Sequence, residues 1–349
     1  MVKQRMTDDF EQLPESNWER WVKGHRRKRA AFLHRETARP SVFYRDAAVL
    51  SKGAISLVDM TRSEPERRGI VRGLSPSGFH KIAYVDWGPL DNTRPVICVH
   101  GLTRQGRDFD YLVAELVISG RRVICPDLPG RGRSDWLTNP NDYSLPQYCS
   151  DMNALLARLD VEQVDWVGTS LGGLIGMVLA GFPGSIIQSL VINDIGPYVS
   201  SIGLRRIGQY MGNMPASFAT IEDAEQYLRT VLAPYGYLVD EHWRHLTLHS
   251  VRPDDEHQGS YNLRCDPAIA KAFGTPWFYP ALDLWKYWEA IKIPTLVLRG
   301  ANSDLLSRDL ALEMQRRNRR ADIFQFDNCG HVPPLMTADQ ISVVTRFLE

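Results

Sequence analysis

The chain has 349 residues, 44% of them hydrophobic, which is enough for one large α/β domain that carries an insertion. Its 41 basic and 41 acidic residues cancel to a formal net charge of zero, so no nucleic acid or strongly acidic partner is expected. The 5 cysteines follow no metal-binding spacing, and neither a secretion signal at residues 1–20 nor an apolar run of about 18 residues is found. We therefore expect reduced thiols in a cytoplasmic protein without a transmembrane segment, a metal or another cofactor.

Residues 1–68 differ in composition from the rest of the chain. The sequence RWVKGHRRKRAAFLHRETARP at 20–40 is strongly basic, and Trp18, Trp21 and Val22 would share one side of a helix. A basic patch of this kind can bind a membrane surface or a nucleic acid. We favour a solvated basic arm that packs its aromatic side chains on the main domain, because acidic residues elsewhere cancel its charge.

From residue 69 onwards, strand and helix patterns alternate regularly. This alternation predicts a parallel sheet with right-handed crossovers, formed by residues 69–196 and 291–349. The predicted strands are 69–74, 80–88, 95–100, 121–127, 163–170, 188–196, 293–300 and 321–327, and the predicted helices are 107–119, 146–159, 171–182, 307–318 and 333–348.

The regular alternation of strand and helix patterns is interrupted between residues 197 and 290. This stretch is rich in aromatic residues and has helix-like pieces but no clear alternating strands. We interpret it as a helical lid or cap inserted after the sixth strand.

A serine lies between two glycines in Gly168-Thr169-Ser170-Leu171-Gly172, after a predicted strand and before a predicted helix. A sharp strand-to-helix turn of this kind lifts the central side chain above the edge of the sheet, and glycines avoid Cβ clashes there. It also places the N–H of Leu171 at a helix N-terminus, where negative charge is favoured. The pattern predicts Ser170 as a nucleophile.

A serine nucleophile needs a base and a carboxylate that orients it. His331 in FDNCGHVPPL follows the last predicted strand, and the other histidines fit the carboxyl edge of the sheet less well. For the acid we expect Asp304, in a turn just after the seventh strand. Asp194, which ends the sixth strand, is the alternative, whereas Asp127 fits local turn hydrogen bonds better.

Acyl transfer also needs donors for the developing oxyanion. Gly101, in the sequence VHGLTRQGRDF after the third strand, lets the backbone approach a substrate. The N–H groups of Leu102 and Leu171 are the predicted pair of donors.

These motifs, HGLTR, DLPGRGRSD, GTSLGG, GANSD and CGHVPP, resemble those of the α/β-hydrolase superfamily, in that superfamily's order. The resemblance covers roughly residues 70–349 and points to a lid-bearing esterase or carbon–carbon hydrolase branch. It implies an eight-stranded, mostly parallel sheet flanked by helices, with a lid after strand six. It also implies the roles of nucleophile for Ser170, acid for Asp304, base for His331 and oxyanion donors for Leu102 and Leu171.

The serine at position 170 disfavours the related dehalogenases and epoxide hydrolases, which resemble this chain but use an aspartate there. We expect a serine hydrolase that cleaves small to medium apolar carboxylic esters through an acyl-enzyme intermediate. The alternatives are carbon–carbon hydrolysis of ring-fission diketones, lactone hydrolysis or acyl transfer. A ligand-binding protein on a retired hydrolase scaffold is a further alternative of a different kind.

The expected partner is a small-molecule substrate, and a homodimer through the lid or the basic arm is possible. Arg104 is a candidate for binding a carboxylate or carbonyl, or for an ion pair, and Arg131 is expected to hold a loop. The other candidate substrate-binding residues are His100, Gly101, Trp277 and Phe278, of which the two aromatic residues can equally form the core of the insert.

Overall fold

The computed structural model describes residues 67–255, 257–273 and 281–349. All of them belong to one compact unit, Ile55–Glu349. The predicted basic arm at 1–68 lies outside the described residues, except that Arg67 and Arg68 already pair with Asp86 and Val85 as the start of the first strand.

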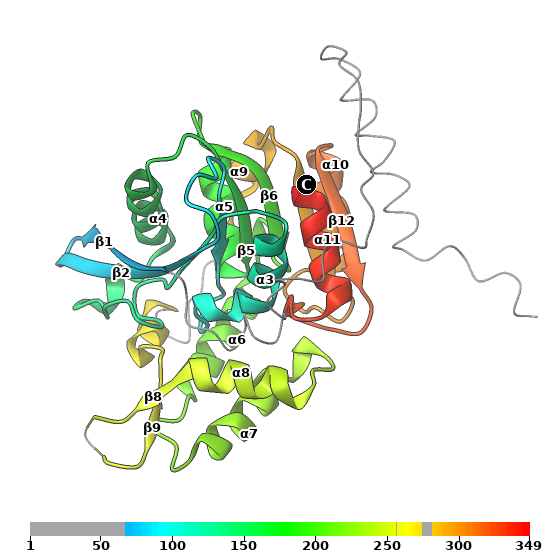
Figure 1. Cartoon of the computed structure of the whole chain (residues 1–349). Helices are drawn as coiled ribbons and strands as arrows, with labels where there is room; N and C mark the ends of the chain where they lie inside the picture. Colours follow the sequence, from blue (N-terminus) through cyan, green and yellow to red (C-terminus); the bar gives the residue numbers. More distant parts are fainter. Residues whose placement is uncertain (1–66, 256, 274–280) are drawn as a thin grey trace, which may run out of the picture. The chain divides into compact units, whose positions relative to one another are not determined.

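An eight-stranded sheet forms the centre of the molecule, with strand order β1-β2-β4-β3-β5-β6-β11-β12 (Figure 1). Strand β2 is antiparallel to both of its neighbours, and every other pair from β4 to β12 is parallel. The predicted α/β fold with a mostly parallel eight-stranded sheet is therefore confirmed. Its strands are β1 Arg67–Ser75, β2 Gly78–Trp87, β3 Val96–Val99, β4 Val123–Pro126, β5 Val164–Thr169, β6 Ile187–Asn193, β11 Thr295–Gly300 and β12 Ala321–Phe326.

The middle strands are buried on both faces, as their continuous apolar runs require. Helix α3 packs beside α11, whereas α4, α5 and α9 follow one another in a second layer (Figure 1). The bounds of these helices are α3 Asp110–Ile118, α4 Leu145–Leu159, α5 Leu171–Gly181, α9 Trp285–Ala290 and α11 Ala338–Leu348. One more helix, α10 Arg308–Arg317, packs beside β12.

Two helix boundaries differ from the predictions for local reasons. The predicted helix 107–119 is divided into a 3-10 turn, η1 Gly106–Phe109, and helix α3. The predicted helix 333–348 begins only at Ala338. Pro334 biases the backbone of Pro333 away from helical geometry, and Leu335 lies in the left-handed region with φ 57°.

The segment between β6 and β11 is a mixture of helices and short strands rather than purely helical. The strand β7 Tyr198–Val199 pairs with β10 Leu282–Asp283, and β8 Val251–Pro253 pairs with β9 Tyr261–Leu263. The segment's other elements are α6 Ser201–Gly212, α7 Ile221–Val231, η3 Ala233–Tyr235, α8 Asp240–Ser250, η4 Pro267–Phe273 and helix α9. Its function as a lid stays a prediction.

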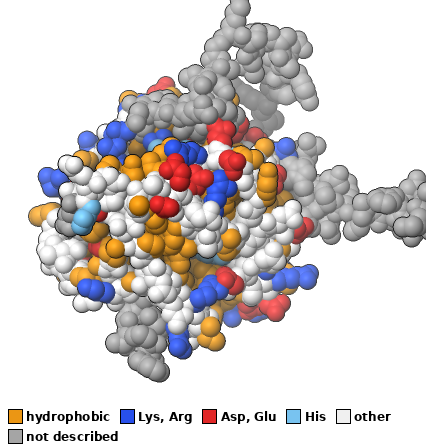
Figure 2. All heavy atoms as spheres, turned by 90° about the horizontal axis from the view of Figure 1, so that it is seen from below, with side chains coloured by type: hydrophobic (Ala, Val, Ile, Leu, Met, Phe, Trp, Pro, Cys, Tyr) orange, Lys and Arg blue, Asp and Glu red, His pale blue; other side chains and the backbone are white. Residues whose placement is uncertain are grey.

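Figure 2 looks onto the side of the molecule that carries α6, α7 and α8, and shows hydrophobic side chains across the middle of this face. The strongly exposed apolar residues of this segment include Ile202 and Tyr237. The predicted homodimer through this segment stays a prediction.

Among the described residues, no helix is both long and apolar enough to cross a membrane. The 5 cysteines are buried and form no disulfide, as expected for reduced thiols.

Candidate active site

Ser170 stands at the turn between β5 and α5 in a strained backbone conformation, with φ 50° and ψ −109°. The turn is tight: a Cβ atom on Gly168 would lie 2.2 Å from the carbonyl oxygen of Gly172, and one on Gly172 would lie 2.0 Å from that of Val99. Only glycine fits at both positions. Backbone strain that is confined to a single residue in this way is typical of a functional site.

His331 connects Ser170 to a buried carboxylate. Its Nε2 lies 3.1 Å from Ser170 Oγ, and its Nδ1 lies 2.8 Å from Asp194 Oδ2. Asp194 is completely buried, and its other oxygen accepts a 2.9 Å hydrogen bond from the N–H of Gly300. A hydroxyl, an imidazole and a carboxylate thus form one hydrogen-bonded line, contributed by three segments of the chain.

The expectation that Asp304 orients His331 is wrong. The side chain of Asp304 is 51% exposed and forms a surface ion pair with Arg206. Asp194 directly follows β6, which is the neighbour of β5 in the sheet. Asp304 follows β11, which is one strand farther away from β5. The end of β11 contributes the N–H of Gly300, which helps to hold Asp194.

Asn193 fixes the relative positions of the three segments, a role that the sequence analysis missed. Its side-chain N–H groups donate to Thr169 Oγ1 at 3.2 Å and to the carbonyl of Pro333 at 2.8 Å, and its backbone carbonyl accepts from the N–H of Ser170. It therefore joins the residue before the serine to the loop after the histidine. Its position at the very end of β6, beside Asp194, was the only available signal.

The loop after β3 lies against Ser170, as predicted for the oxyanion side of the site. A Cβ on Gly101 would be 3.7 Å from the Cβ of Ser170. Arg131 is fully buried and donates its Nε to the carbonyl of Leu102 at 2.7 Å, which confirms that it holds a loop. The N–H of Leu171 belongs to the first turn of α5, where helices leave N–H groups unpaired.

His100 anchors this loop and offers no ring nitrogen to a substrate. Its Nε2 lies 2.9 Å from the N–H of Leu128, which donates to it, so Nδ1 carries the proton and donates to the carbonyl of Gly101 at 2.7 Å. Complete burial lowers the pKa of His100 to about 3, which keeps the ring neutral. Any contact with a substrate would be through the edge of its ring.

Arg104 is an ion-pair residue, one of the two alternatives expected for it. Its Nε and Nη2 donate to the two oxygens of Asp108 at 2.6 and 2.7 Å, and Gln105 adds a bond of 3.1 Å to the same carboxylate. The guanidinium is buried, and burial competes with Asp108, whose charge raises the pKa of Arg104 above its ordinary value. Its charge is therefore matched within the protein.

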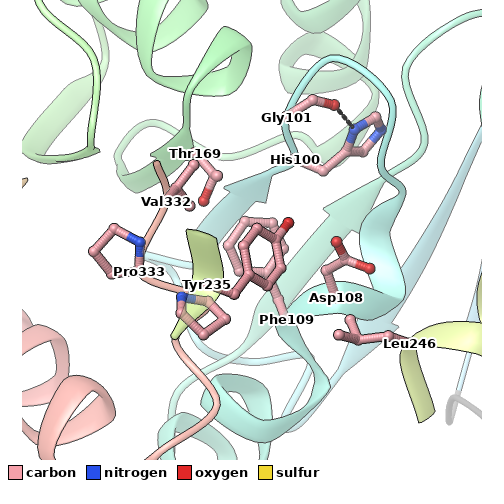
Figure 3. Close-up of a pocket in the computed structure, with 10 residues that line it drawn as sticks. His100, Gly101, Asp108, Phe109, Thr169, Tyr235, Leu246, Val332 and Pro333 are labelled. Atoms are coloured by element: carbon pink, nitrogen blue, oxygen red, sulfur yellow. Dashed lines mark hydrogen bonds between the residues drawn. The ribbon is translucent and has the colours of Figure 1, made fainter. Parts of the chain in front are cut away.

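A pocket is lined by Thr169 and Val332, the chain neighbours of Ser170 and His331, and has an empty volume of about 310 Å³ that includes space open to solvent (Figure 3). It contains Gly101 and His100 as predicted, whereas Trp277 and Phe278 lie outside the described residues. Two polar residues in its wall, Asp108 and Tyr235, were not predicted: Asp108 lies in the stretch VHGLTRQGRDF but was given no role, and Tyr235 lies in the insert. The lining residues are His100, Gly101, Asp108, Phe109, Thr169, Tyr235, Leu246, Val332, Pro333 and Pro334.

One cluster in the described part of the chain has the residue types of a metal site. Asp110, His245 and His249 each bring one possible ligand atom to within 4.8 Å of the others. However, Arg107 already donates to Asp110 at 2.6 Å, and burial together with the Arg107 charge lowers the pKa of His249 to about 2. Because these surroundings are cationic, we assign no metal to the cluster.

This fold and this line of side chains define a class of protein. The sequence model of the alpha/beta hydrolase family matches residues 96–342, and the chain belongs to that family. Among characterised relatives, it is 44% identical over 290 residues to a 3-hydroxybutyrate-oligomer hydrolase of Cupriavidus necator, an alignment that covers 82% of this chain and 98% of the relative.

Solved structures agree with this assignment. The chain resembles a putative hydrolase from Rickettsia typhi with a TM-score of 0.74 and 31% identity, over 81% of this chain and 98% of that one. It also resembles an alpha/beta hydrolase from Novosphingobium aromaticivorans with a TM-score of 0.71 and 32% identity, over 82% and 99% of the two chains. The protein is therefore a hydrolase of the alpha/beta family.

Proposed function

We propose that this protein is a serine hydrolase that cleaves the ester bonds of short 3-hydroxybutyrate oligomers through an acyl-enzyme intermediate. The observation that carries the proposal is the line Ser170–His331–Asp194, with separations of 3.1 and 2.8 Å. The substrate class rests on the relative with 44% identity, which this chain matches over 98% of the relative's length. It replaces the broader expectation of small to medium apolar esters.

In the first half of the reaction, His331 takes the proton of Ser170 while the serine oxygen bonds to the ester carbonyl carbon. The charge that develops on the carbonyl oxygen is stabilised by the N–H groups of Leu102 and Leu171. Asp194 holds the imidazole in the tautomer that presents Nε2 to the serine, and it stabilises the imidazolium. His331 then gives the proton to the leaving alcohol, and the serine ester of the acyl group is left.

In the second half, His331 removes a proton from a water molecule, which attacks the acyl-enzyme. Collapse of this second intermediate breaks the serine ester, returns the proton to Ser170 and releases a carboxylic acid. Each cycle thus consumes one ester bond and one water.

The direct test is release of 3-hydroxybutyrate from its linear trimer. Ser170→Ala should lower kcat by at least about 10⁴-fold, because the nucleophile and its base act as a unit. Ser201→Ala, which changes an exposed serine at the start of α6, is the matched control and should retain full activity. A fluorophosphonate probe should label the wild-type chain but not the Ser170→Ala variant.

Trimer hydrolysis that survives in Ser170→Ala would refute the nucleophile. Rapid turnover of a ring-fission diketone, with only slow ester turnover, would instead support the carbon–carbon hydrolase that the sequence left as an alternative.

A further inference from the structure

The pocket beside Ser170 has two polar groups that the reaction itself does not use. Tyr235 and Asp108 both line it, and in Figure 3 the Tyr235 hydroxyl and the Asp108 carboxylate face the same part of the pocket. The two groups also interact electrostatically. The remaining wall is formed mainly by apolar surface, including Phe109, Leu246 and Val332.

Tyr235 presents a hydroxyl that donates. Burial raises the pKa of this phenol above its ordinary value, and Asp108 adds to the effect against the opposing charge of Arg104, so the group stays protonated. Tyr235 is 8% exposed, and no hydrogen bond joins its hydroxyl to another described residue. The hydroxyl is not one of the fully buried unpartnered atoms, so its donor is available to a group in the pocket.

Asp108 presents an oxygen that accepts. Its carboxylate receives one bond on Oδ2, from Arg104, and two on Oδ1, from Arg104 and Gln105. A carboxylate has about four acceptor sites, so one remains for a ligand. Its side chain is 14% exposed.

The backbone of Tyr235 is held on the loop that carries His331. The carbonyl of Pro234 accepts a 2.6 Å hydrogen bond from the N–H of Gly330, the residue before His331. On the other side, a Cβ on Gly236 would lie 2.4 Å from the carbonyl oxygen of Asn328. The phenol is thus fixed relative to the base, as a group that orients a substrate must be.

We infer that Tyr235 and Asp108 together bind the 3-hydroxyl of a 3-hydroxyacyl group whose carbonyl lies at Ser170. This inference rests on the proposed function. A hydroxyl is the one group of the oligomer that both accepts, here from Tyr235, and donates, here to Asp108. An ester carbonyl has no proton for Asp108, and a terminal carboxylate would be repelled by it.

The inference predicts from which end the oligomer is cleaved. Only the terminal unit at the hydroxyl end of an oligomer has a free 3-hydroxyl, so the enzyme removes single units from that end.

The test compares two esters that differ by one hydroxyl: p-nitrophenyl 3-hydroxybutyrate and p-nitrophenyl butyrate. In the wild type, kcat/KM should be at least about tenfold higher for the hydroxylated ester. In Tyr235→Phe, the ratio of the two kcat/KM values should fall about tenfold, because the donor is lost while the ring is kept. The ratio does not depend on the concentration of active enzyme, so partial unfolding cannot imitate this result.

Tyr237→Phe is the matched control, since Tyr237 lies two residues away with its side chain 83% exposed. It should leave the ratio at the wild-type value. A wild-type ratio near one, or an unchanged ratio in Tyr235→Phe, would overturn the inference while ester hydrolysis stands. Failure of the wild type to hydrolyse either ester in a Ser170-dependent way would overturn the proposed function, and the inference with it.

Discussion

Asp194 reaches His331 through one unusual backbone conformation. Its φ is 59°, in the left-handed region directly after β6, and its carboxylate lies 2.8 Å from Nδ1 of the imidazole. Asp and Asn tolerate this region better than other residues with a Cβ. An Asn at position 194 should therefore keep the fold and change only the chemistry.

Asp194→Asn should lower kcat for ester hydrolysis by about 10⁴-fold, because the amide no longer favours the productive tautomer of His331 or stabilises the imidazolium. Asp304→Asn should leave kcat within about threefold, since Asp304 pairs with Arg206 at the surface. Steady-state kinetics on one ester, with both variants side by side, gives the answer. A larger loss in Asp304→Asn than in Asp194→Asn would reverse the assignment.

His100 should make the fold sensitive to acid. Burial lowers its pKa to about 3, against about 6.5 in the unfolded chain, so between these values only the unfolded chain takes up the proton. The stabilisation is complete above pH 6.5 and declines as the pH falls. From pH 7 to pH 5, this one residue should lower the free energy of unfolding by about 2 kcal/mol.

Urea unfolding at pH 7 and pH 5 measures this effect. His100→Gln replaces the ring with a side chain that does not titrate, so the difference between the two pH values should shrink by about 2 kcal/mol. An equal difference in the variant and the wild type would show that His100 is not the residue responsible.

At this scale the sequence predicted two residues of the hydrogen-bonded line and missed the third. Ser170 lies in the Gly-x-Ser-x-Gly turn after β5 and His331 follows Gly330 after β12, and the structure brings them together as expected. The choice between Asp194 and Asp304 depended on which strand end lies nearer to His331, and a linear sequence does not contain that distance. Asp108 and Tyr235 are about 130 residues apart in the sequence, so only the folded pocket shows that they belong together.

At the scale of elements, the turn between β5 and α5 depends on close backbone contacts. Gly172→Ala places a Cβ 2.0 Å from the carbonyl oxygen of Val99, a backbone atom that cannot move without shifting β3. We expect a loss of about 1–3 kcal/mol in the free energy of unfolding and a fall in kcat/KM of at least about 100-fold.

Gly212→Ala provides the matched control, because nothing lies within 4 Å of a Cβ at that position at the end of α6. Thermal unfolding and ester kinetics on both variants are the measurements. If Gly172→Ala behaved like Gly212→Ala, the turn would be less constrained than this geometry requires.

Elements with a strong hydrophobic periodicity were predicted well, whereas elements that are fixed by tertiary contacts were not. All eight strands of the sheet lie close to their predicted ranges, because each is an apolar or alternating run bounded by turn residues. The short strands β7 and β10 are two residues each, and they exist only because segments 83 residues or more apart in sequence pair with each other. Such a pairing leaves no local pattern to detect.

At the scale of the whole molecule, the two ends of the parallel strands have different roles. The carboxyl edge carries Ser170, whereas the start of β5 at the opposite edge carries Asp165, which is fully buried. Asp165 accepts from the side chains of Arg94, Arg121 and Ser189. This network joins β5 to β6 and to the two loops that precede β3 and β4.

Asp165→Asn should lower the free energy of unfolding by about 2–4 kcal/mol, the lower part of the range reflecting the partial exposure of Arg94. It should leave kcat/KM of the folded protein within about twofold, since the site is at the other edge. Asp91→Asn, at an exposed position, should change stability by less than about 0.5 kcal/mol. Urea unfolding and kinetics on the same preparations check both statements.

The hydrogen bond from Gly330 to the carbonyl of Pro234 links the insert to the loop of the base. The wall of the pocket and the position of the base are therefore mechanically coupled, because Tyr235 follows Pro234 and His331 follows Gly330. A substitution that displaces η3 should also displace His331.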